Sequence, residues 1–213
     1  MTSLKPAIVI GSGGHAKVVI DTLKTIGQPI LFCTEVDEAC YGNKVFDVSV
    51  AGHDDIINDQ SPKEVVLVNG LGSVGVPNLR KRIFCEWTEK GFEFLTIVHP
   101  TAFVSKTATL EPGSQVMARA VVQTSATIGA NSIVNSSASV DHDCIIGLHC
   151  HIAPGATLSG SVNIGELCHI GTGASLIQSV VVGNRTVVGS GATVTKNVSD
   201  DQVVVGTPAK SIK

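Results

Sequence analysis

The segment VDHDCIIGLHCHIAPGATLSG, residues 140–160, contains three histidines, two aspartates and two cysteines. The side chains that could do chemistry are Asp141, His142, Asp143, Cys144, His149, Cys150 and His151. Imidazole and thiolate are zinc ligands, and an imidazole beside a carboxylate is also a general base suited to neutral pH. The segment is therefore open to three interpretations: a metal site, a catalytic base with helpers, or unrelated surface histidines.

The composition excludes several classes of protein. The chain has 213 residues, of which 15% are charged, and its formal net charge of −3 argues against nucleic acid as the main partner. The opening MTSLKPAIVIGSGGHAK lacks the pattern of a signal peptide, and no stretch approaches the roughly 18 apolar residues of a membrane span. Six cysteines without a CxxC pair are expected to be reduced thiols in a cytoplasmic protein.

Residues 1–97 alternate between strand and helix signals. Apolar runs predict strands, and amphipathic runs closed by Gly27 and Gly91 predict helices. The expected strands are 7–10, 29–33, 65–68 and 92–98, and the expected helices are 15–27 and 76–91. This alternation predicts a small parallel sheet with helices on its faces. The second helix is expected to bury Leu79, Ile83, Phe84 and Trp87 on one face.

From residue 98 the hydrophobic period changes to six. Valine, isoleucine or leucine occupies every sixth position from Val98 to Val194, and a small or modest residue follows four positions later, from Ala102 to Val198. Such a repeat is typical of a parallel β-helix, in which three hexads make one triangular coil of 18 residues. Cys144, Cys150 and Cys168 hold the small inward position, so we expect them to be core residues.

Four segments resemble one family of hexapeptide-repeat acyltransferases. They are IVIGSGGHAKVV, LRKRIFCEWTEKGFEFLTIVHPTAFVS, DHDCIIGLHCHIAPGATLSG and VVVGTPAK. Together they are similar to the sialic acid O-acetyltransferase and UDP-N-acetylbacillosamine-type sugar N-acetyltransferase family. The resemblance implies an α/β Rossmann-like domain over residues 1–97 that binds the sugar nucleotide, and a left-handed parallel β-helix over residues 98–213. It also implies a homotrimer with acetyl-CoA between neighbouring β-helices.

The 18-residue coil separates the histidines. His142 and His151 are nine residues apart, or half a coil, so one chain does not easily bring them onto one metal ion. In a trimer, His142 of one chain can meet His151 of its neighbour. The γ-class carbonic anhydrases bind metal between β-helices in this way, but their ligand spacing is not matched here. We therefore expect no metal and an active site shared between subunits.

The catalytic expectation centres on His142. Acyl transfer from a thioester needs a base for the nucleophile's proton, and a carboxylate on the other ring nitrogen would fix the tautomer. The family's catalytic histidine and the acid after it correspond to His142 and Asp143, with Asp141 as a second possible helper. Gly160 stacks one coil beyond His142, where its N–H is either an oxyanion donor or part of an ordinary turn.

The resemblance implies contacts with acetyl-CoA further along the β-helix. The position of His151 contacts acetyl-CoA in the family, and those of Thr172 and Ser190 contact its pantetheine arm, mainly through backbone groups. His169 stacks on His151 and is expected to be structural, whereas His149 is expected to face solvent.

The turn GSGGHA, residues 11–16, follows a strand and precedes a helix, which suits phosphate binding. The resemblance assigns the nucleotide-linked sugar to Gly13, Gly14 and His15, with a further contact at Gly70. Family members usually carry two acids after the second strand, where this chain has Thr34 and Glu35. Because of that departure, the sequence does not determine which nucleotide the sugar carries.

The sequence therefore predicts an acetyl-CoA-dependent N-acetyltransferase for a UDP- or dTDP-linked amino sugar in bacterial surface-glycan synthesis. One alternative is an O-acetyltransferase of a sialic-type nonulosonic acid, which Thr34 mildly favours. A second alternative is a catalytically inactive trimeric β-helix that serves as a binding module, against which the His142–Asp143 pair argues.

Overall fold

A five-stranded sheet forms the N-terminal part of the chain in the computed structural model, which describes residues 4–212. Its strands are β1 (Ala7–Ile10), β2 (Ile30–Thr34), β3 (Lys44–Val45), β4 (Val48–Gly52) and β5 (Val66–Asn69), in the order β3-β4-β2-β1-β5. The pairs β1–β2, β1–β5 and β2–β4 are parallel, and β3–β4 is antiparallel. The predicted parallel sheet is confirmed, and the short β3–β4 hairpin is an addition that the alternation of signals did not indicate.

One α-helix covers each face of this sheet. Helix α1 (Gly14–Thr25) packs on the face that presents Ala7 and Val9, and α2 (Asn78–Glu89) packs on the face that presents Ile8 and Ile10. Two 3₁₀ helices, η1 (Glu38–Cys40) and η2 (Asp54–Asp59), lie in the connections. Helix α1 ends as predicted, because Gly27 has a φ of 71° and donates to the carbonyl of Lys24. Within residues 4–212, no helix combines the length and the apolar character that crossing a membrane requires.

Two details around α2 differ from the prediction. Leu79 is 48% exposed, and Arg80 is buried instead, with an exposed fraction of 1%. The strand expected at 92–98 is broken into two pieces: Phe94 forms a single parallel bridge with Leu67 of β5, and β6 (Ile97–Val98) pairs with the β-helix. Both differences arise because α2 lies against a second part of the protein, which helical periodicity does not report.

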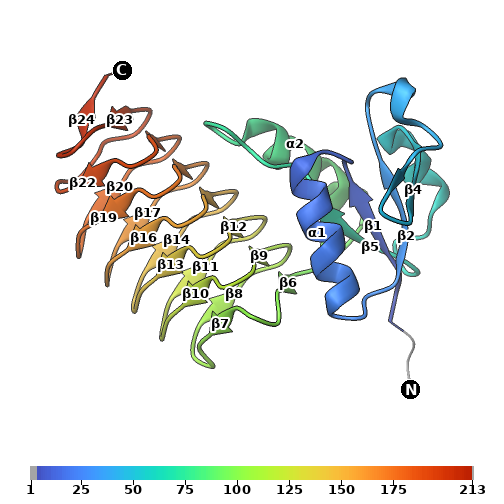
Figure 1. The fold of residues 1–213 in the computed structure, drawn as a ribbon, viewed down its shortest axis with the longest axis horizontal. Helices are drawn as coiled ribbons and strands as arrows, with labels where there is room; N and C mark the ends of the chain where they lie inside the picture. Colours follow the sequence, from blue (N-terminus) through green and yellow to red (C-terminus); the bar gives the residue numbers. More distant parts are fainter. Residues whose placement is uncertain (1–3, 213) are drawn as a thin grey trace.

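The rest of the chain is a parallel β-helix of two-residue strands (Figure 1). The strands after β6 are β7 (Phe103–Val104), β8 (Thr109–Leu110), β9 (Gln115–Val116), β10 (Val121–Val122), β11 (Thr127–Ile128), β12 (Ile133–Val134), β13 (Ser139–Val140), β14 (Ile145–Ile146), β15 (His151–Ile152), β16 (Thr157–Leu158), β17 (Asn163–Ile164), β18 (His169–Ile170), β19 (Ser175–Leu176), β20 (Val181–Val182), β21 (Val187–Val188), β22 (Thr193–Val194), β23 (Val203–Val205) and β24 (Lys210–Ser211). Every strand from β6 to β22 ends on one of the aliphatic positions of the six-residue repeat.

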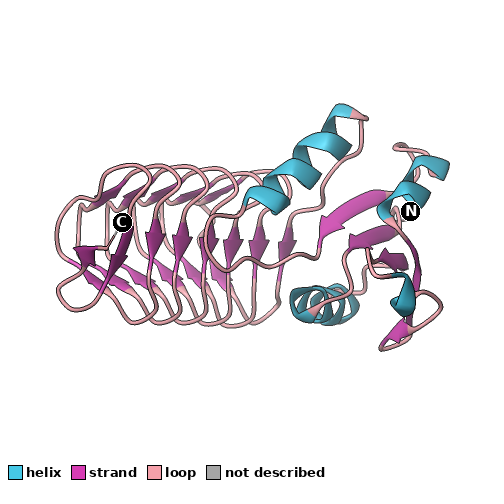
Figure 2. Cartoon of the chain, turned by 90° about the horizontal axis from the view of Figure 1, so that it is seen from above, coloured by secondary structure: helices cyan, strands magenta, loops and turns pink. Residues whose placement is uncertain are grey.

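Three sheets form the sides of the β-helix, and Figure 2 shows their strands stacked along its axis. Partners in neighbouring coils are 18 residues apart, as in Ile133 with His151 and Val121 with Ser139. The predicted coil length is therefore confirmed. The inward aliphatic and small residues form one buried cluster, which includes Cys144, Cys150 and Cys168 with no exposed surface.

The corners of the coils impose a second period of six. Every sixth residue from Gly113 to Gly191 has a positive φ near 60°, and it is often not glycine; examples are Asn131, Asp143 and His149. Glycines form columns where neighbouring coils approach closely. A Cβ added to Gly147 would lie 2.7 Å from the carbonyl carbon of Gly165 in the next coil. The column of Gly129, Gly147 and Gly165 therefore reflects a packing requirement.

The two parts pack closely together. Side chains of α1, such as Val19 and Ile20, share a buried cluster with Met117 and Ile133 of the β-helix. The predicted domain boundary between residues 97 and 98 falls inside β6, which pairs with β9. The division into two separately folding domains stays a prediction.

Substituting Gly147→Ala tests the packing of the coils. We expect it to destabilise the protein by about 1–3 kcal/mol, because the new methyl group meets backbone that has no room to yield. Thermal unfolding measures the change, and Asn163→Ala, at an exposed outward position of β17, is the control. Equal unfolding midpoints for the two variants would contradict the close approach of the coils.

Candidate active site

A histidine and a carboxylate form a pair at one corner of the β-helix. Nδ1 of His142 lies 2.7 Å from Oδ2 of Asp143, and the backbone N–H of His142 donates to Oδ1 of Asp141 at 2.7 Å. Asp143, not Asp141, therefore contacts the ring. The hydrogen bond with Asp143 raises the pKa of His142 above its ordinary value. When the ring is neutral, Asp143 keeps the proton on Nδ1 and leaves Nε2 as the basic nitrogen.

Gly160 lies against the free edge of that ring. A Cβ built on Gly160 would lie 2.4 Å from Nε2 of His142, so a side chain at this position would displace the imidazole. Among the described residues, the backbone N–H of Gly160 has no hydrogen-bond acceptor. The predicted stacking of the two residues is confirmed, and Gly160 has a free backbone N–H.

A second corner of the β-helix carries Thr172 and Ser190. Both side chains are exposed, and they continue a column of corner residues that includes Ser136 and Pro154. The carbonyl groups of Pro154 and Thr172 accept hydrogen bonds from Gly173 and Gly191 in the following coils. No acceptor occurs for the backbone N–H of Thr172 or Ser190 within residues 4–212, so these groups are available to amide carbonyls of a ligand.

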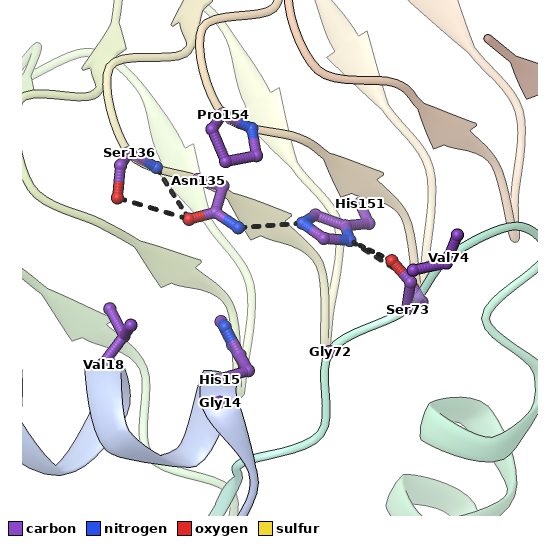
Figure 3. A pocket seen from close by; sticks show the side chains of 10 residues that line it. All are labelled: Gly14, His15, Val18, Gly72, Ser73, Val74, Asn135, Ser136, His151 and Pro154. Carbon is purple, nitrogen blue, oxygen red and sulfur yellow. Dashed lines mark hydrogen bonds between the residues drawn. The ribbon is translucent and has the colours of Figure 1, made fainter. Parts of the chain in front are cut away.

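A cavity of about 550 Å³ lies where the N-terminal part meets the β-helix (Figure 3). We call it the junction cavity. Its lining comes from the start of α1, the loop after β5 and one corner of the β-helix: Gly14, His15, Val18, Gly72, Ser73, Val74, Asn135, Ser136, His151 and Pro154. The structure thus brings Gly14 and His15, predicted for the sugar, together with His151, predicted for acetyl-CoA. Gly13, the residue before α1, is exposed but does not line this cavity.

The two histidines of the junction cavity are neutral. Burial, with a smaller contribution from the charge of Arg80, lowers the pKa of His15 to about 4. Burial likewise lowers the pKa of His151 to about 3, and both of its ring nitrogens have partners, Ser73 and Asn135 (Figure 3). The ring of His169 stands edge-on to that of His151, with centroids 5.1 Å apart, and burial lowers its pKa too.

A second cavity, of about 290 Å³, opens at the carboxyl ends of β1, β2 and β5. We call it the sheet-edge cavity, and it is lined by Ile10, Gly11, Glu35, Val36, His53, Asp54, Asp55, Leu71, Leu79, Arg82, Ile83 and Glu86. It lies where parallel α/β sheets bind ligands, beside the strand at which the connections reverse direction.

Thr34 and Glu35 hold the glycine-rich turn beside this cavity. Oε2 of Glu35 accepts from Oγ of Ser12 at 2.5 Å, which is the main reason that the pKa of Glu35 is lowered. Thr34 donates to Oδ1 of Asp54 at 2.5 Å and accepts from the N–H of Gly11. Glu35 lines the sheet-edge cavity, whereas Thr34 is buried behind it. Asp54, which lines the sheet-edge cavity, is therefore the acid in contact with Thr34.

Gly70 is in the interior of the N-terminal part. A Cβ there would lie 2.7 Å from the carbonyl oxygen of Ile10, so glycine is required for β1 and β5 to continue side by side. It lines neither cavity.

The prediction that His149 faces solvent is wrong. Its exposed fraction is 4%, its ring meets Phe84 edge-on with centroids 5.5 Å apart, and its Nδ1 lies 3.0 Å from Nδ2 of Asn131. Burial lowers the pKa of His149 to about 4. The reason is that α2 covers this corner of the β-helix, which the repeat cannot show.

Sequence reasoning also missed a buried polar network that joins the two parts. Arg80 donates to the carbonyl groups of Asn69, Leu71 and Asn131, and Asn69 donates to Oδ1 of Asn131 at 3.1 Å. No carboxylate neutralises Arg80 among the described residues, and burial lowers its pKa to about 9. Arg80 follows Leu79 directly, and its positive charge favoured an exposed position over this role.

Within residues 4–212, no three histidine, cysteine, aspartate or glutamate side chains come together in a way that could hold a metal ion. The segment 140–160 instead contains the exposed His142–Asp143 pair, two inward cysteines, and two histidines that the N-terminal part covers.

Solved structures of similar sequence share this architecture. The acetyltransferase domain of PglB from Neisseria gonorrhoeae, solved with acetyl coenzyme A, is 36% identical, with a TM-score of 0.91 over 99% of this chain and 100% of that chain. The perosamine N-acetyltransferase of Caulobacter crescentus, solved as a histidine-to-asparagine mutant with CoA and GDP-perosamine, is 31% identical, with a TM-score of 0.89 over 99% and 98%.

Two further comparisons bear on the chain. The family described as the PglD N-terminal domain matches residues 7–87. WeeI from Acinetobacter baumannii is 23% identical, with a TM-score of 0.86 over 97% of this chain and 99% of that chain, and this likeness shows the fold alone. No curated protein matches the chain significantly.

Asp143→Asn tests the contact that raises the pKa of His142. Removing the carboxylate removes the favourable interaction with the protonated ring, so the pKa of His142 should fall toward its ordinary value of about 6.5. An NMR titration of the His142 ring signals measures the shift. Asp141→Asn is the comparison and should lower the pKa less, and the reverse order would contradict the assignment of Asp143.

Gly160→Ala tests the contact on the other edge of the ring. The new methyl group would overlap Nε2 of His142, so the imidazole must move. The atoms nearest to the methyl group belong to this side chain and not to backbone. We therefore expect a changed His142 titration with a loss of stability below about 1 kcal/mol, or less than about 4 °C in the unfolding midpoint. An unchanged titration would show that Gly160 does not limit the position of the ring.

Proposed function

The chain belongs to the family of sugar N-acetyltransferases that includes the perosamine enzyme and the PglB domain, which are acetyl-CoA-dependent acetyltransferases, and we propose that it acetylates the amino group of a nucleotide-linked amino sugar. The observation that carries this proposal is the His142–Asp143 pair, whose basic Nε2 lies against Gly160, a residue with a free backbone N–H. Base and oxyanion donor are the two groups that acyl transfer from a thioester requires.

His142 acts as the general base. The amine of the sugar attacks the thioester carbonyl carbon, and Nε2 of His142 accepts the proton that the nitrogen loses as the new C–N bond forms. Asp143 holds the proton on Nδ1 and stabilises the imidazolium that results. The C–S bond then breaks, and the CoA thiolate takes up the proton from the imidazolium. No acyl-enzyme is formed, because the inward Cys144 next to the pair is sealed in the core.

Acetyl-CoA is a substrate that the corners of the β-helix fit. Its pantetheine arm would run along the column of Thr172 and Ser190, where unpartnered backbone N–H groups meet its amide carbonyls. The N–H of Gly160 would receive the developing negative charge on the thioester oxygen. His151 would contact acetyl-CoA through its ring face, since both ring nitrogens already have partners.

The nucleotide-linked sugar fits the N-terminal part. The sheet-edge cavity would take the nucleoside, with its carboxylates receiving base or ribose donors, and the N-terminus of α1 at Gly13 and Gly14 would receive the diphosphate. The sugar would enter the junction cavity with His15. The base of the nucleotide stays open: the predicted choice between uracil and thymine is widened by the solved relative that binds GDP-perosamine.

The site requires more than one chain. His142 and the junction cavity lie on different corners of the β-helix, and His142 does not line the cavity. A homotrimer would bring His142 of one chain to the junction cavity of its neighbour. Cytoplasmic location and a role in bacterial surface-glycan synthesis remain predictions, of which the first accords with the six free thiols.

Two alternatives are weaker. O-acetylation of a free nonulosonic acid would leave the sheet-edge cavity without a role, although Thr34 at an acid position first suggested it. An inactive binding module would not need the His142–Asp143 pair beside a glycine that clears space for its ring.

His142→Ala should lower kcat by about 10²–10⁴-fold, because the base is lost while the binding surfaces remain. The assay measures CoA release with UDP-, dTDP- and GDP-linked amino sugars and with free nonulosonic acids. His99→Ala, at a half-buried histidine outside both cavities, is the control. Wild-type turnover in His142→Ala would overturn the mechanism, and turnover of nonulosonic acids alone would favour O-acetylation.

A further inference from the structure

Gln115 joins the β-helix to the junction cavity through a hydrogen bond of fixed direction. Its side chain is fully buried on β9, and its Nε2 donates to the carbonyl oxygen of Asn69 at 2.8 Å. Because the amide nitrogen is committed to that carbonyl, the amide oxygen faces Nε2 of His15 at 2.8 Å. An amide oxygen only accepts hydrogen bonds, so Nε2 of His15 must carry a proton.

The other nitrogen of His15 is thereby left as an acceptor. The low pKa of His15, about 4, keeps the ring neutral at physiological pH, and a neutral imidazole carries a single N–H. Nδ1 of His15 has no partner among the described residues and is not one of their buried unpartnered atoms. Since His15 lines the junction cavity, this lone pair is open to a ligand there.

His151 is fixed in the opposite tautomer. Asn135 accepts from the N–H of Ser136 at 2.8 Å with its oxygen, so its nitrogen donates to Nε2 of His151 at 3.0 Å. The proton of His151 is then on Nδ1, which donates to the carbonyl oxygen of Ser73 at 3.1 Å. The two rings are close, with centroids 6.5 Å apart. Among the described residues, His15 and His151 supply the ring nitrogens of this cavity, and only Nδ1 of His15 has no hydrogen-bond partner.

The rest of the lining explains why this one acceptor matters. None of the residues around the junction cavity is aspartate, glutamate, lysine or arginine. A ligand part that binds there is recognised by hydrogen bonds and shape, and not by ion pairing. The hydroxyl and amino groups of a sugar are donors that suit an unprotonated ring nitrogen.

We propose that Gln115 is a positioning residue, which holds His15 in the Nε2–H tautomer so that Nδ1 accepts a hydrogen bond from a hydroxyl or amino group of the sugar. The identity of the ligand rests on the proposed function, whereas the tautomer does not. Because Gln115 belongs to the β-helix and His15 to α1, the acceptor exists only when the two parts are docked. With the proton on Nδ1 instead, a donor of the sugar would meet a donor of the protein.

The tautomer can be read directly in the unmodified protein. Long-range ¹H–¹⁵N NMR spectra of histidine side chains distinguish a protonated from an unprotonated ring nitrogen, and His15→Asn identifies the signal of His15. At neutral pH we expect a protonated Nε2 and an unprotonated Nδ1. A protonated Nδ1, or signals averaged between the two tautomers, would overturn the proposal without bearing on acetyl transfer.

Gln115→Leu removes the acceptor that holds the proton. We expect the KM for the sugar nucleotide to rise by about tenfold to a hundredfold, with kcat and the KM for acetyl-CoA nearly unchanged, and the His15 signals to average between tautomers. Gln60→Leu, at a half-buried glutamine outside both cavities, is the control. If wild type turns over and the KM in Gln115→Leu stays within about twofold, the positioning role is wrong.

Gln115→Glu keeps an acceptor but adds a charge. The carboxylate raises the pKa of His15 against the opposing charge of Arg80 and the neighbouring ring of His151, so Nδ1 becomes protonated as the pH falls. Because the carboxylate cannot donate to the carbonyl of Asn69, the KM for the sugar should be raised at high pH and should rise further as the pH falls. A KM raised equally at all pH values would show a packing defect and contradict the proposal. If no sugar nucleotide is acetylated by wild type, the proposed function fails, and the NMR result still decides the tautomer.

Discussion

A buried guanidinium without a carboxylate partner holds the two parts of this protein together. Arg80 is 1% exposed and donates to carbonyl groups of both parts, those of Asn69 and Asn131. Burying a charge is costly unless hydrogen bonds compensate it; here Nη1 and Nη2 have carbonyl acceptors, and Nε has no partner. Because the acceptors come from both parts, the N-terminal sheet can dock on the β-helix in few ways. The position of the junction cavity, and of the residues from both parts that line it, depends on that docking.

The same arrangement divides the histidines into two chemical kinds. Burial, assisted by the charge of Arg80, lowers the pKa values of His15, His149 and His151, which makes them neutral hydrogen-bonding groups. His142 lies outside this region, exposed beside Asp143, and its pKa is raised. Histidine therefore serves both as a base for proton transfer and as a neutral group for recognition, and the surroundings of each ring determine which role it has.

The β-helix could be predicted almost completely from the sequence, because each strand is two residues long and ends on one periodic aliphatic position. The pairing of His142 with Asp143 and its stacking on Gly160 followed from local sequence and the coil length. The docking could not be predicted. Arg80 sits next to Leu79, which the helical pattern placed inside, and His149 occupies a corner that is exposed in an isolated repeat. Gln115 occupies an outward position, where the repeat constrains no residue type.

The central claim is that His142 of one chain serves the junction cavity of another. Mixing subunits tests it most directly: His142→Ala chains and His15→Ala chains are combined, and trimers that contain both are isolated. The assay uses a sugar concentration well below KM, at which each parent alone is expected to be nearly inactive. Every mixed trimer would contain one site with both histidines intact, so about one third of wild-type activity should return. Mixed trimers as inactive as their parents would contradict a site shared between chains.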